Sequence, residues 1–147
     1  MIDRFKFKVK FKTDDKIEIF DVIDINFDSQ QVSFRRQDGM VYNIGLGVKG
    51  TELIQCTGLK DNRGKLIYEG DIVKYFCPAE YCSDELHKCP ECYSGENGSV
   101  HYDEDLAMYE YRSKSDQCPL TDNINTEEDL EIIGNIYENP ELLKDGE

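Results

Sequence analysis

Residues 4–12 alternate between basic and apolar side chains. The odd positions from residue 5 onward hold Phe5, Phe7, Val9 and Phe11. A period of two is the pattern of a β-strand, because successive side chains leave opposite faces of a sheet. The pattern predicts a strand with its apolar face on a core and a basic face toward solvent. The residues of that basic face are Arg4, Lys6, Lys8, Lys10 and Lys12.

Short apolar segments separated by turn residues continue along the rest of the chain. Gly39 predicts a tight hairpin, because glycine adopts a positive φ at low cost. Pro140 suits the first position of one helical turn over 139–143, and the polar segment 113–127 is expected to be a loop. Short strands with frequent turns favour an all-β fold. The expected strands cover residues 17–27, 32–35, 40–44, 52–57, 66–68, 72–76, 99–103, 107–112 and 129–137.

Three closely spaced glycines, Gly45, Gly47 and Gly50, predict an internal boundary. We expect an N-terminal β-hairpin or meander subdomain over residues 1–50. Residues 51–147 are expected to form a small SH3-like β-barrel, because a Gly-Asp pair opening an apolar strand is common in such barrels. A cysteine-rich insert at 77–97 interrupts this second part.

Composition narrows the class of protein. The chain has 147 residues, of which 39% are hydrophobic and 11% aromatic, so it is a globular domain rather than a disordered chain. No apolar run approaches the ~20 residues that span a bilayer, and charges occupy the place of a signal peptide's apolar region. We expect a cytoplasmic protein without membrane contact, whose cysteines are reduced.

The net charge of −14 is unevenly distributed. Residues 1–60 hold ten Lys or Arg and nine Asp or Glu, a net charge of +1. Residues 61–147 hold seven Lys or Arg and 22 Asp or Glu, a net charge of −15. An acidic surface keeps a protein soluble, and it also suits a basic partner or a mimic of DNA. Because this half repels phosphates, we expect a protein partner or self-association rather than nucleic acid.

The insert carries four cysteines in the spacing Cys-x4-Cys-x6-Cys-x2-Cys. Four thiolates satisfy a tetrahedral zinc ion, and a two-residue gap lets both cysteines of a pair reach one ion. A polar loop has little core of its own, so a metal would supply its order. The sequence therefore predicts a structural zinc site. Its ligands are Cys77, Cys82, Cys89 and Cys92.

Other interpretations of the cysteines stay open. The Cys-x2-Cys half alone also suits a redox pair or two ordinary thiols, and six residues between the halves make a cramped loop. His87 can replace one thiolate, most readily Cys82. Cys56 is expected to be a small buried residue, and Cys118 a stray additional ligand. Four thiolates leave no position for water, so a catalytic zinc is not indicated.

The basic strand and the carboxylates offer two further candidate sites. The basic face can follow a phosphate backbone, so a nucleic-acid-binding module is the alternative function. The simpler interpretation is a solvated lysine face that discourages edge-to-edge pairing of strands. The clustered carboxylates can act in acid–base catalysis or hold Mg²⁺, but ordinary turn and surface chemistry is the favoured explanation. They are Asp103, Glu104, Asp105 and Glu110. An enzyme would require a pocket that gathers Asp103, Glu110 or His101. Common catalytic motifs are absent, so we expect no enzyme.

Two segments together resemble the YopX family of small bacteriophage and prophage proteins. The first contains Thr57-Gly58-Leu59-Lys60-Asp61 and Tyr68-Glu69-Gly70-Asp71-Ile72-Val73, and the second runs from Glu131 to Leu143. The resemblance implies a β-barrel fold of phage origin and no established reaction. We therefore expect a non-enzymatic binding or accessory module of undefined molecular function.

Overall fold

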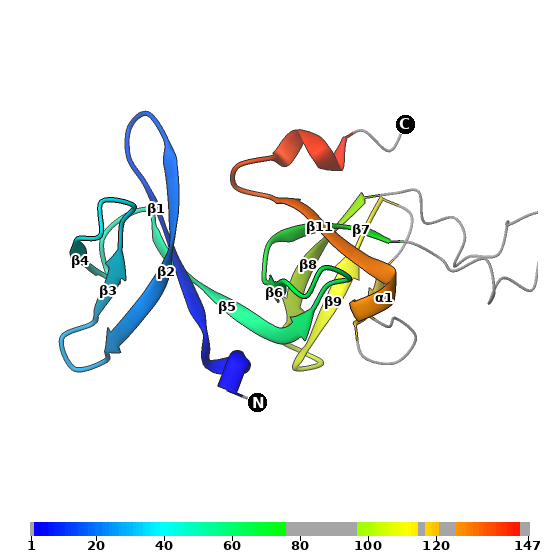
Figure 1. Cartoon of the computed structure of the whole chain (residues 1–147), viewed down its shortest axis with the longest axis horizontal. Helices are drawn as coiled ribbons and strands as arrows, with labels where there is room; N and C mark the ends of the chain where they lie inside the picture. The colour runs from blue at the N-terminus through cyan, green and yellow to red at the C-terminus, as the bar shows by residue number, and fades with distance from the viewer. Residues whose placement is uncertain (1, 76–96, 115–116, 121–125, 145–147) are drawn as a thin grey trace, which may run out of the picture. The chain divides into compact units, whose positions relative to one another are not determined.

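The computed structural model describes residues 2–75, 97–114, 117–120 and 126–144, and antiparallel strands dominate it (Figure 1). One sheet has the order β4-β3-β2-β1-β5-β6 and the other the order β10-β9-β8-β7-β11. The all-β class is confirmed. The strands are β1 (Phe7–Lys12), β2 (Ile17–Asn26), β3 (Gln31–Arg35), β4 (Val41–Gly45), β5 (Thr51–Lys60), β6 (Leu66–Tyr68), β7 (Asp71–Tyr75), β8 (Asn97–Asp103), β9 (Met108–Arg112), β10 (Gln117–Pro119) and β11 (Leu130–Asn135).

Helical segments are short. They are the 3₁₀ turn η1 (Ile2–Phe5), the single turn α1 (Thr126–Asp129) and the 3₁₀ turn η4 (Pro140–Leu143). The last of these is the turn expected at 139–143, and Pro140 opens it. Among the described residues, no helix is long and apolar enough to cross a membrane.

The expected barrel requires a correction, because neither sheet closes on itself within the described residues. A barrel forms only when the two edge strands of a sheet pair with each other. In the second sheet the edges are β10 and β11, and β10 is three residues long and ends in Pro119. Proline has no N–H to donate to a ladder. The second sheet is therefore open.

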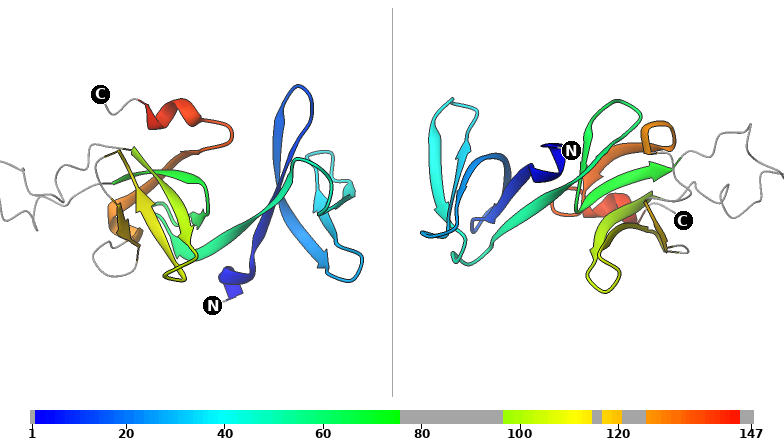
Figure 2. Two further views of the ribbon diagram at one scale, coloured as in Figure 1. Left: turned by 180° about the vertical axis from the view of Figure 1, so that it is seen from behind. Right: turned by 90° about the horizontal axis from the view of Figure 1, so that it is seen from below.

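The chain forms two compact units, which we call the N-terminal unit (Met1–Cys56) and the C-terminal unit (Thr57–Glu147). The segment Gly45–Gly50, where the sequence placed a boundary, is the turn between β4 and β5. β5 begins in the N-terminal unit and ends in the C-terminal unit, as the views in Figure 2 show.

A row of aromatic rings crosses the sheet of the N-terminal unit. Phe11, Phe20, Phe34 and Tyr42 come from β1 to β4, with centroids 5.9 Å apart for Phe11–Phe20, 5.0 Å for Phe20–Phe34 and 6.1 Å for Phe34–Tyr42. These residues lie on the same face: Phe34 is directly opposite Tyr42, whereas Phe20 is opposite Val9 and is a diagonal neighbour of Phe11. Only three residues of this core are fully buried, namely Val9, Val32 and Phe34.

The C-terminal unit has a larger buried core on one face of its sheet. On β8 and β9, Val100 and Tyr111 are directly opposite each other and point into this core. Because side chains alternate, their neighbours on each strand point to the other face, which is polar. The core residues are Ile67, Val73, Val100, Tyr111, Leu120 and Leu130.

Candidate functional site

The predicted basic strand lies inside a sheet, not at its edge. β1 pairs with β2 on one side and with β5 on the other. The strand begins at Phe7, later than the sequence predicted, and Arg4 belongs to η1 instead. The idea that lysines protect an exposed N-terminal edge is therefore corrected. Lys8, Lys10 and Lys12 do share one face of β1.

Carboxylates accompany the basic residues. Lys6 Nζ lies 2.8 Å from Asp3 Oδ1, and this contact raises the pKa of Lys6. Lys10 Nζ donates to Glu52 Oε2 across β1 and β5 at 2.6 Å. A phosphate backbone would have to compete with these carboxylates for the same ammonium groups. This arrangement weakens the case for a nucleic-acid site on β1.

The four predicted zinc ligands, Cys77, Cys82, Cys89 and Cys92, lie outside the described residues, as does His87. Cys56 is buried and Cys118 is half-buried, and the two do not form a disulfide with each other. Within the described ranges, no group of three or more His, Cys, Asp or Glu side chains is arranged to hold a metal. The zinc site therefore stays a prediction.

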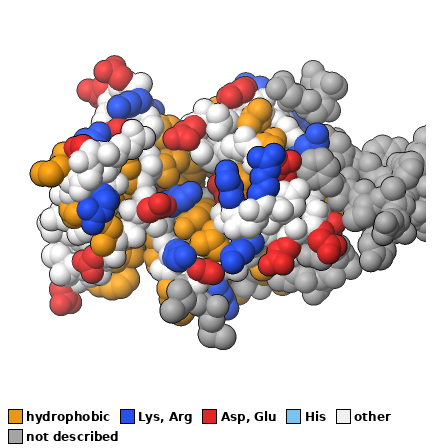
Figure 3. Space-filling model, in the orientation of Figure 1, with side chains coloured by type: hydrophobic (Ala, Val, Ile, Leu, Met, Phe, Trp, Pro, Cys, Tyr) orange, Lys and Arg blue, Asp and Glu red, His pale blue; other side chains and the backbone are white. Residues whose placement is uncertain are grey.

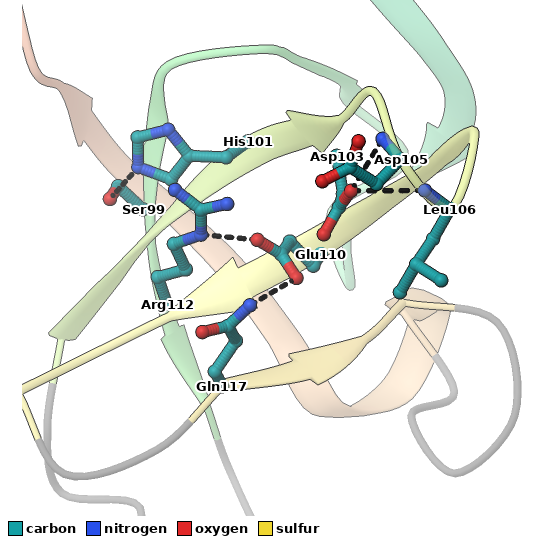
Figure 4. A network of polar contacts seen from close by, with 8 residues as sticks. All are labelled: Ser99, His101, Asp103, Asp105, Leu106, Glu110, Arg112 and Gln117. Atoms are coloured by element: carbon teal, nitrogen blue, oxygen red, sulfur yellow. Dashed lines mark hydrogen bonds and ion pairs between the residues drawn. The ribbon is translucent and has the colours of Figure 1, made fainter.

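A polar network covers the face of β8, β9 and β10 opposite the core (Figure 4). Register explains how it assembles: Ser99 is opposite Arg112, and His101 is opposite Glu110. Gln117 is opposite Arg112 on the next strand. Residues opposite each other in an antiparallel pair share a face. Polar side chains from three strands therefore meet there.

Glu110 is the buried centre of this network. Its side chain is 4% exposed, and both of its oxygens are occupied. Arg112 Nε donates to Oε1, and Gln117 Nε2 donates to Oε2 at 2.7 Å. A buried carboxylate is tolerated when it is paired and hydrogen-bonded in this way. Glu110 thus ties β9 to β10.

His101 has a lowered pKa. Burial lowers its pKa below the usual value, the nearby Arg112 lowers it further, and Glu110 acts in the opposite direction. Its Nε2 is hydrogen-bonded to Ser99 Oγ at 2.7 Å. A serine–histidine contact suits nucleophilic catalysis only when a third group orients the histidine. Here the oxygens of Glu110 bond to Arg112 and Gln117 instead.

The network supports an exposed hairpin tip, which we define as residues Tyr102–Ala107. Asp103 Oδ1 accepts hydrogen bonds from the backbone N–H groups of Asp105 (2.9 Å) and Leu106 (3.0 Å), so it caps the turn. Glu104 and Asp105 are exposed. Leu106, with 61% of its surface exposed, stands beside them.

Tyr102 adds an aromatic surface at the base of the tip. It is 40% exposed and packs edge-to-face on Tyr109, with ring centroids 5.1 Å apart. Acidic side chains flanked by exposed leucine and tyrosine suit contact with a protein, because aromatic and apolar groups provide most of the energy at protein interfaces.

The residues that carried the family resemblance are structural. Asp61 is buried, and its Oδ1 accepts from the N–H groups of Arg63 (2.9 Å) and Lys65 (2.8 Å). Its Oδ2 accepts from the N–H of Ile132 at 3.0 Å. One carboxylate therefore joins the turn after β5 to β11, which belongs to the other motif segment.

Gly70 makes a second link between the two motif segments. Its φ is +84°, and a Cβ there would lie 2.9 Å from Cε2 of Tyr137. Only glycine permits both the backbone conformation and the close ring. Asp71 Oδ2 accepts from Tyr68 N–H in the same turn, at 2.8 Å. The two motifs identify a way of closing the fold rather than a reaction centre.

Sequence reasoning found the carboxylates of the network but missed their partners. Segment 113–127 was expected to be a loop, yet it contains β10 and part of α1. The detectable signal was period-two alternation in Ser99-x-His101-x-Asp103 and Glu110-x-Arg112, which places five polar side chains on one face. Gln117 gave no such signal, because β10 is too short to show a period.

The family model described as "YopX protein" matches residues 5–144 of this chain. No protein with a curated description is significantly similar to the chain.

Two crystal structures share the fold. Protein EF1440 from Enterococcus faecalis superimposes with a TM-score of 0.56 at 23% identity, covering 94% of this chain and 96% of that one. Protein yopX from Bacillus subtilis gives a TM-score of 0.55 at 18% identity, covering 95% and 96%. Both likenesses extend over both units.

Proposed function

The chain belongs to the YopX family, and from this premise we propose that it is a non-catalytic binding module whose hairpin tip contacts a basic protein. We place this module in the cytoplasm of a bacterial host and in a phage or prophage context, as the resemblance implies. The proposal assigns it no substrate and no membrane partner.

The division of charge between the units carries the proposal. The N-terminal unit contains nine Lys or Arg and nine Asp or Glu, and its net charge is zero. The C-terminal unit contains eight Lys or Arg and 22 Asp or Glu, and its net charge is −14. All of the net charge therefore belongs to the unit that presents the tip. Such a field attracts basic partners and speeds their encounter.

Rigid support makes the tip suitable as a contact point. Asp103 fixes the turn, while the bond from Gln117 to Glu110 ties β9 to β10 beneath it. A preorganised surface binds at a lower entropic cost than a flexible one. Glu104 and Asp105 supply charge for orientation, and Leu106 supplies apolar area.

Charge reversal tests the proposal. The variant Glu104→Lys/Asp105→Lys should lose the host protein that cross-links to the wild-type chain, and binding of that protein should weaken as salt increases. Asp14→Lys/Asp15→Lys is the matched control, because it makes the same change in an exposed hairpin turn of the N-terminal unit. The measurement is cross-linking followed by mass spectrometry and titration of the identified partner.

Equal binding by both variants would reject the tip as the contact. A gel shift with duplex DNA at about 20 mM salt addresses the nucleic-acid alternative. A shift abolished by Lys8→Glu and not by Glu104→Lys would favour that alternative over our proposal.

We also propose that Cys77, Cys82, Cys89 and Cys92 bind one structural zinc ion. The support is their spacing and residue type. Protein purified without chelator should contain about one zinc per chain, measured by plasma mass spectrometry, and Cys92→Ser should reduce this content. Cys118→Ser separates the four-cysteine site from one with an additional ligand: four ligands predict an unchanged zinc content, and a loss would identify Cys118 as a further ligand. Absence of metal from freshly reduced protein would reject the zinc site.

A further inference from the structure

The strand β4 is an edge strand of the N-terminal unit (Figure 1). One further backbone hydrogen bond flanks each end of the β3–β4 ladder. Arg36 N–H donates to the carbonyl of Met40 at 3.0 Å, and Leu46 N–H donates to the carbonyl of Gln30 at 2.8 Å. In an antiparallel ladder, hydrogen-bonded pairs alternate with pairs whose N–H and C=O groups point away. The pairs of Tyr42 with Phe34 and Ile44 with Val32 are therefore bonded across to β3.

The intervening residues of β4 direct their backbone groups outward, away from β3. They are Val41, Asn43 and Gly45. The carbonyl of Gly45 accepts one bond, from Val48 N–H at 3.1 Å, and a carbonyl has a second lone pair. This row is a template for another antiparallel strand.

The other sheet edges in the described part of the chain carry features that discourage pairing. β6 spans three residues between Lys65 and Glu69, and β10 contains Pro119. β11 contains Glu131 and an irregularity in register between Ile132 and Gly134. Short strands, charges, proline and bulges are the devices by which proteins protect edges. β4 has none of them, because residues 39–48 include no charged side chain and no proline.

Apolar side chains are exposed along this edge. Val41 is 52% exposed, and Met40 and Val48 are also exposed. Figure 3 shows hydrophobic side chains at the surface of the N-terminal unit, at the left of that view. An uncharged edge with exposed apolar residues favours pairing with another strand over solvation.

We propose that β4 pairs with β4 of a second copy of this chain, antiparallel and about a two-fold axis at Asn43. Only an axis at Asn43 uses all three outward residues symmetrically, with Val41 opposite Gly45 on each side. The same register places Tyr42 opposite Ile44 of the second copy. An aromatic residue opposite a β-branched one is a favourable cross-strand pair.

The charge division points to a second copy joined through this unit. Two copies repel each other through their C-terminal units, each with a net charge of −14, but the N-terminal unit has no net charge. The contact is isologous and therefore closes as a dimer. It extends the aromatic row past Tyr42, which stacks on Phe34. This dimer is independent of the hairpin tip.

A charge swap at the axis tests the dimer. Asn43→Lys places two lysines opposite each other, and Asn43→Asp places two aspartates opposite each other, so each variant alone should raise the dimer dissociation constant about tenfold or more. Mixing the two variants should restore the dimer, because residue 43 faces itself only in this register. Sedimentation velocity across a concentration series measures the mass.

Ile23→Lys is the matched control, since Ile23 is exposed on the interior strand β2 and should leave the dimer intact. Recovery of the dimer in the mixture also shows that both variants fold. Wild-type protein that stays a monomer at every concentration would overturn the proposal. So would dimers that persist in both single variants, or a mixture that stays monomeric.

Discussion

The two units differ in the kinds of residue that they bury. The N-terminal unit has a small core with a row of stacked rings, and the buried residues of this core cluster are Val9, Val32 and Phe34. The C-terminal unit buries carboxylates as well as apolar residues, and the carboxylates of Asp61 and Glu110 are hydrogen-bonded. Buried charges with fixed partners specify one arrangement of the chain, whereas apolar packing tolerates change.

This difference extends to the surfaces. The N-terminal unit is electrically neutral and exposes apolar side chains on an edge strand, while the C-terminal unit concentrates the negative charge. Neutral apolar edges suit association of like with like, and a charged surface suits an oppositely charged partner. One chain thus contains two surfaces with different binding chemistry.

The largest expected effect comes from Asp61→Ala. It leaves three backbone N–H donors without their carboxylate, two in the turn after β5 and one on β11. We expect a loss of about 4 kcal/mol in the free energy of unfolding of the C-terminal unit. Denaturant unfolding combined with hydrogen exchange will measure it, and amides of the N-terminal unit should keep their protection.

Asp61→Asn is the control for side-chain size, because its amide oxygen still accepts hydrogen bonds from the turn. It should lower the free energy of unfolding by about half as much as Asp61→Ala does. Equal losses in both units after Asp61→Ala would show that they unfold together and would remove the energetic distinction between them.

A smaller effect is expected from Phe34→Leu. Phe34 stacks on Phe20 and on Tyr42 and also contacts the ring of Phe11, so the substitution removes three ring contacts and leaves a void. We expect the free energy of unfolding of the N-terminal unit to fall by about 2 kcal/mol, with no change in the C-terminal unit. Phe27→Leu is the exposed control and should change the free energy of unfolding by less than about 0.5 kcal/mol. Similar costs for both would mean that the row contributes no packing energy.

The smallest expected effect concerns the pH dependence of the C-terminal unit. The pKa of His101 is lowered in the folded state by burial and by Arg112, with Glu110 opposing. As pH falls, the histidine of the unfolded chain therefore binds a proton before the histidine of the folded chain does. The contribution of His101 to the free energy of unfolding is complete above about pH 6.5, and it is lost as pH falls toward the pKa of the folded state. His101→Gln should remove this part of the pH dependence.

Denaturant unfolding at about pH 7.5 and about pH 5.5 tests this expectation. The wild-type chain should lose more stability between the two conditions than His101→Gln does. Ser99→Ala, which keeps the histidine, should preserve the sign of the difference. An unchanged pH dependence in His101→Gln would show that another group titrates.

Much of the fold was predictable because its strands are local patterns. The alternation around Val9 and the turn at Gly39 identified strands and a hairpin, and Gly39 has the positive φ expected of it. Sheet order was not predictable, since it depends on contacts distant in sequence. The alternation that identified β1 could not show that this strand lies between β2 and β5.

The site was less accessible to sequence reasoning. Glu110 was visible as a carboxylate, but its partner Gln117 comes from a strand of three residues in a polar segment. Likewise, nothing local to Asp61 indicates that it bonds to Ile132. Such roles arise from tertiary pairing, and they appear in the sequence only as isolated polar residues.

The bond between Asp61 and Ile132 has a consequence for the order of synthesis. A growing chain can complete the N-terminal unit once Cys56 has left the ribosome, because all strands that pair with β1 have then been made. The bond from Ile132 to Asp61 cannot form until Ile132 has been translated. Contacts between distant residues close slowly, and domains fold as they emerge. We therefore expect a vectorial pathway, in which the neutral unit is folded while the acidic unit is still incomplete.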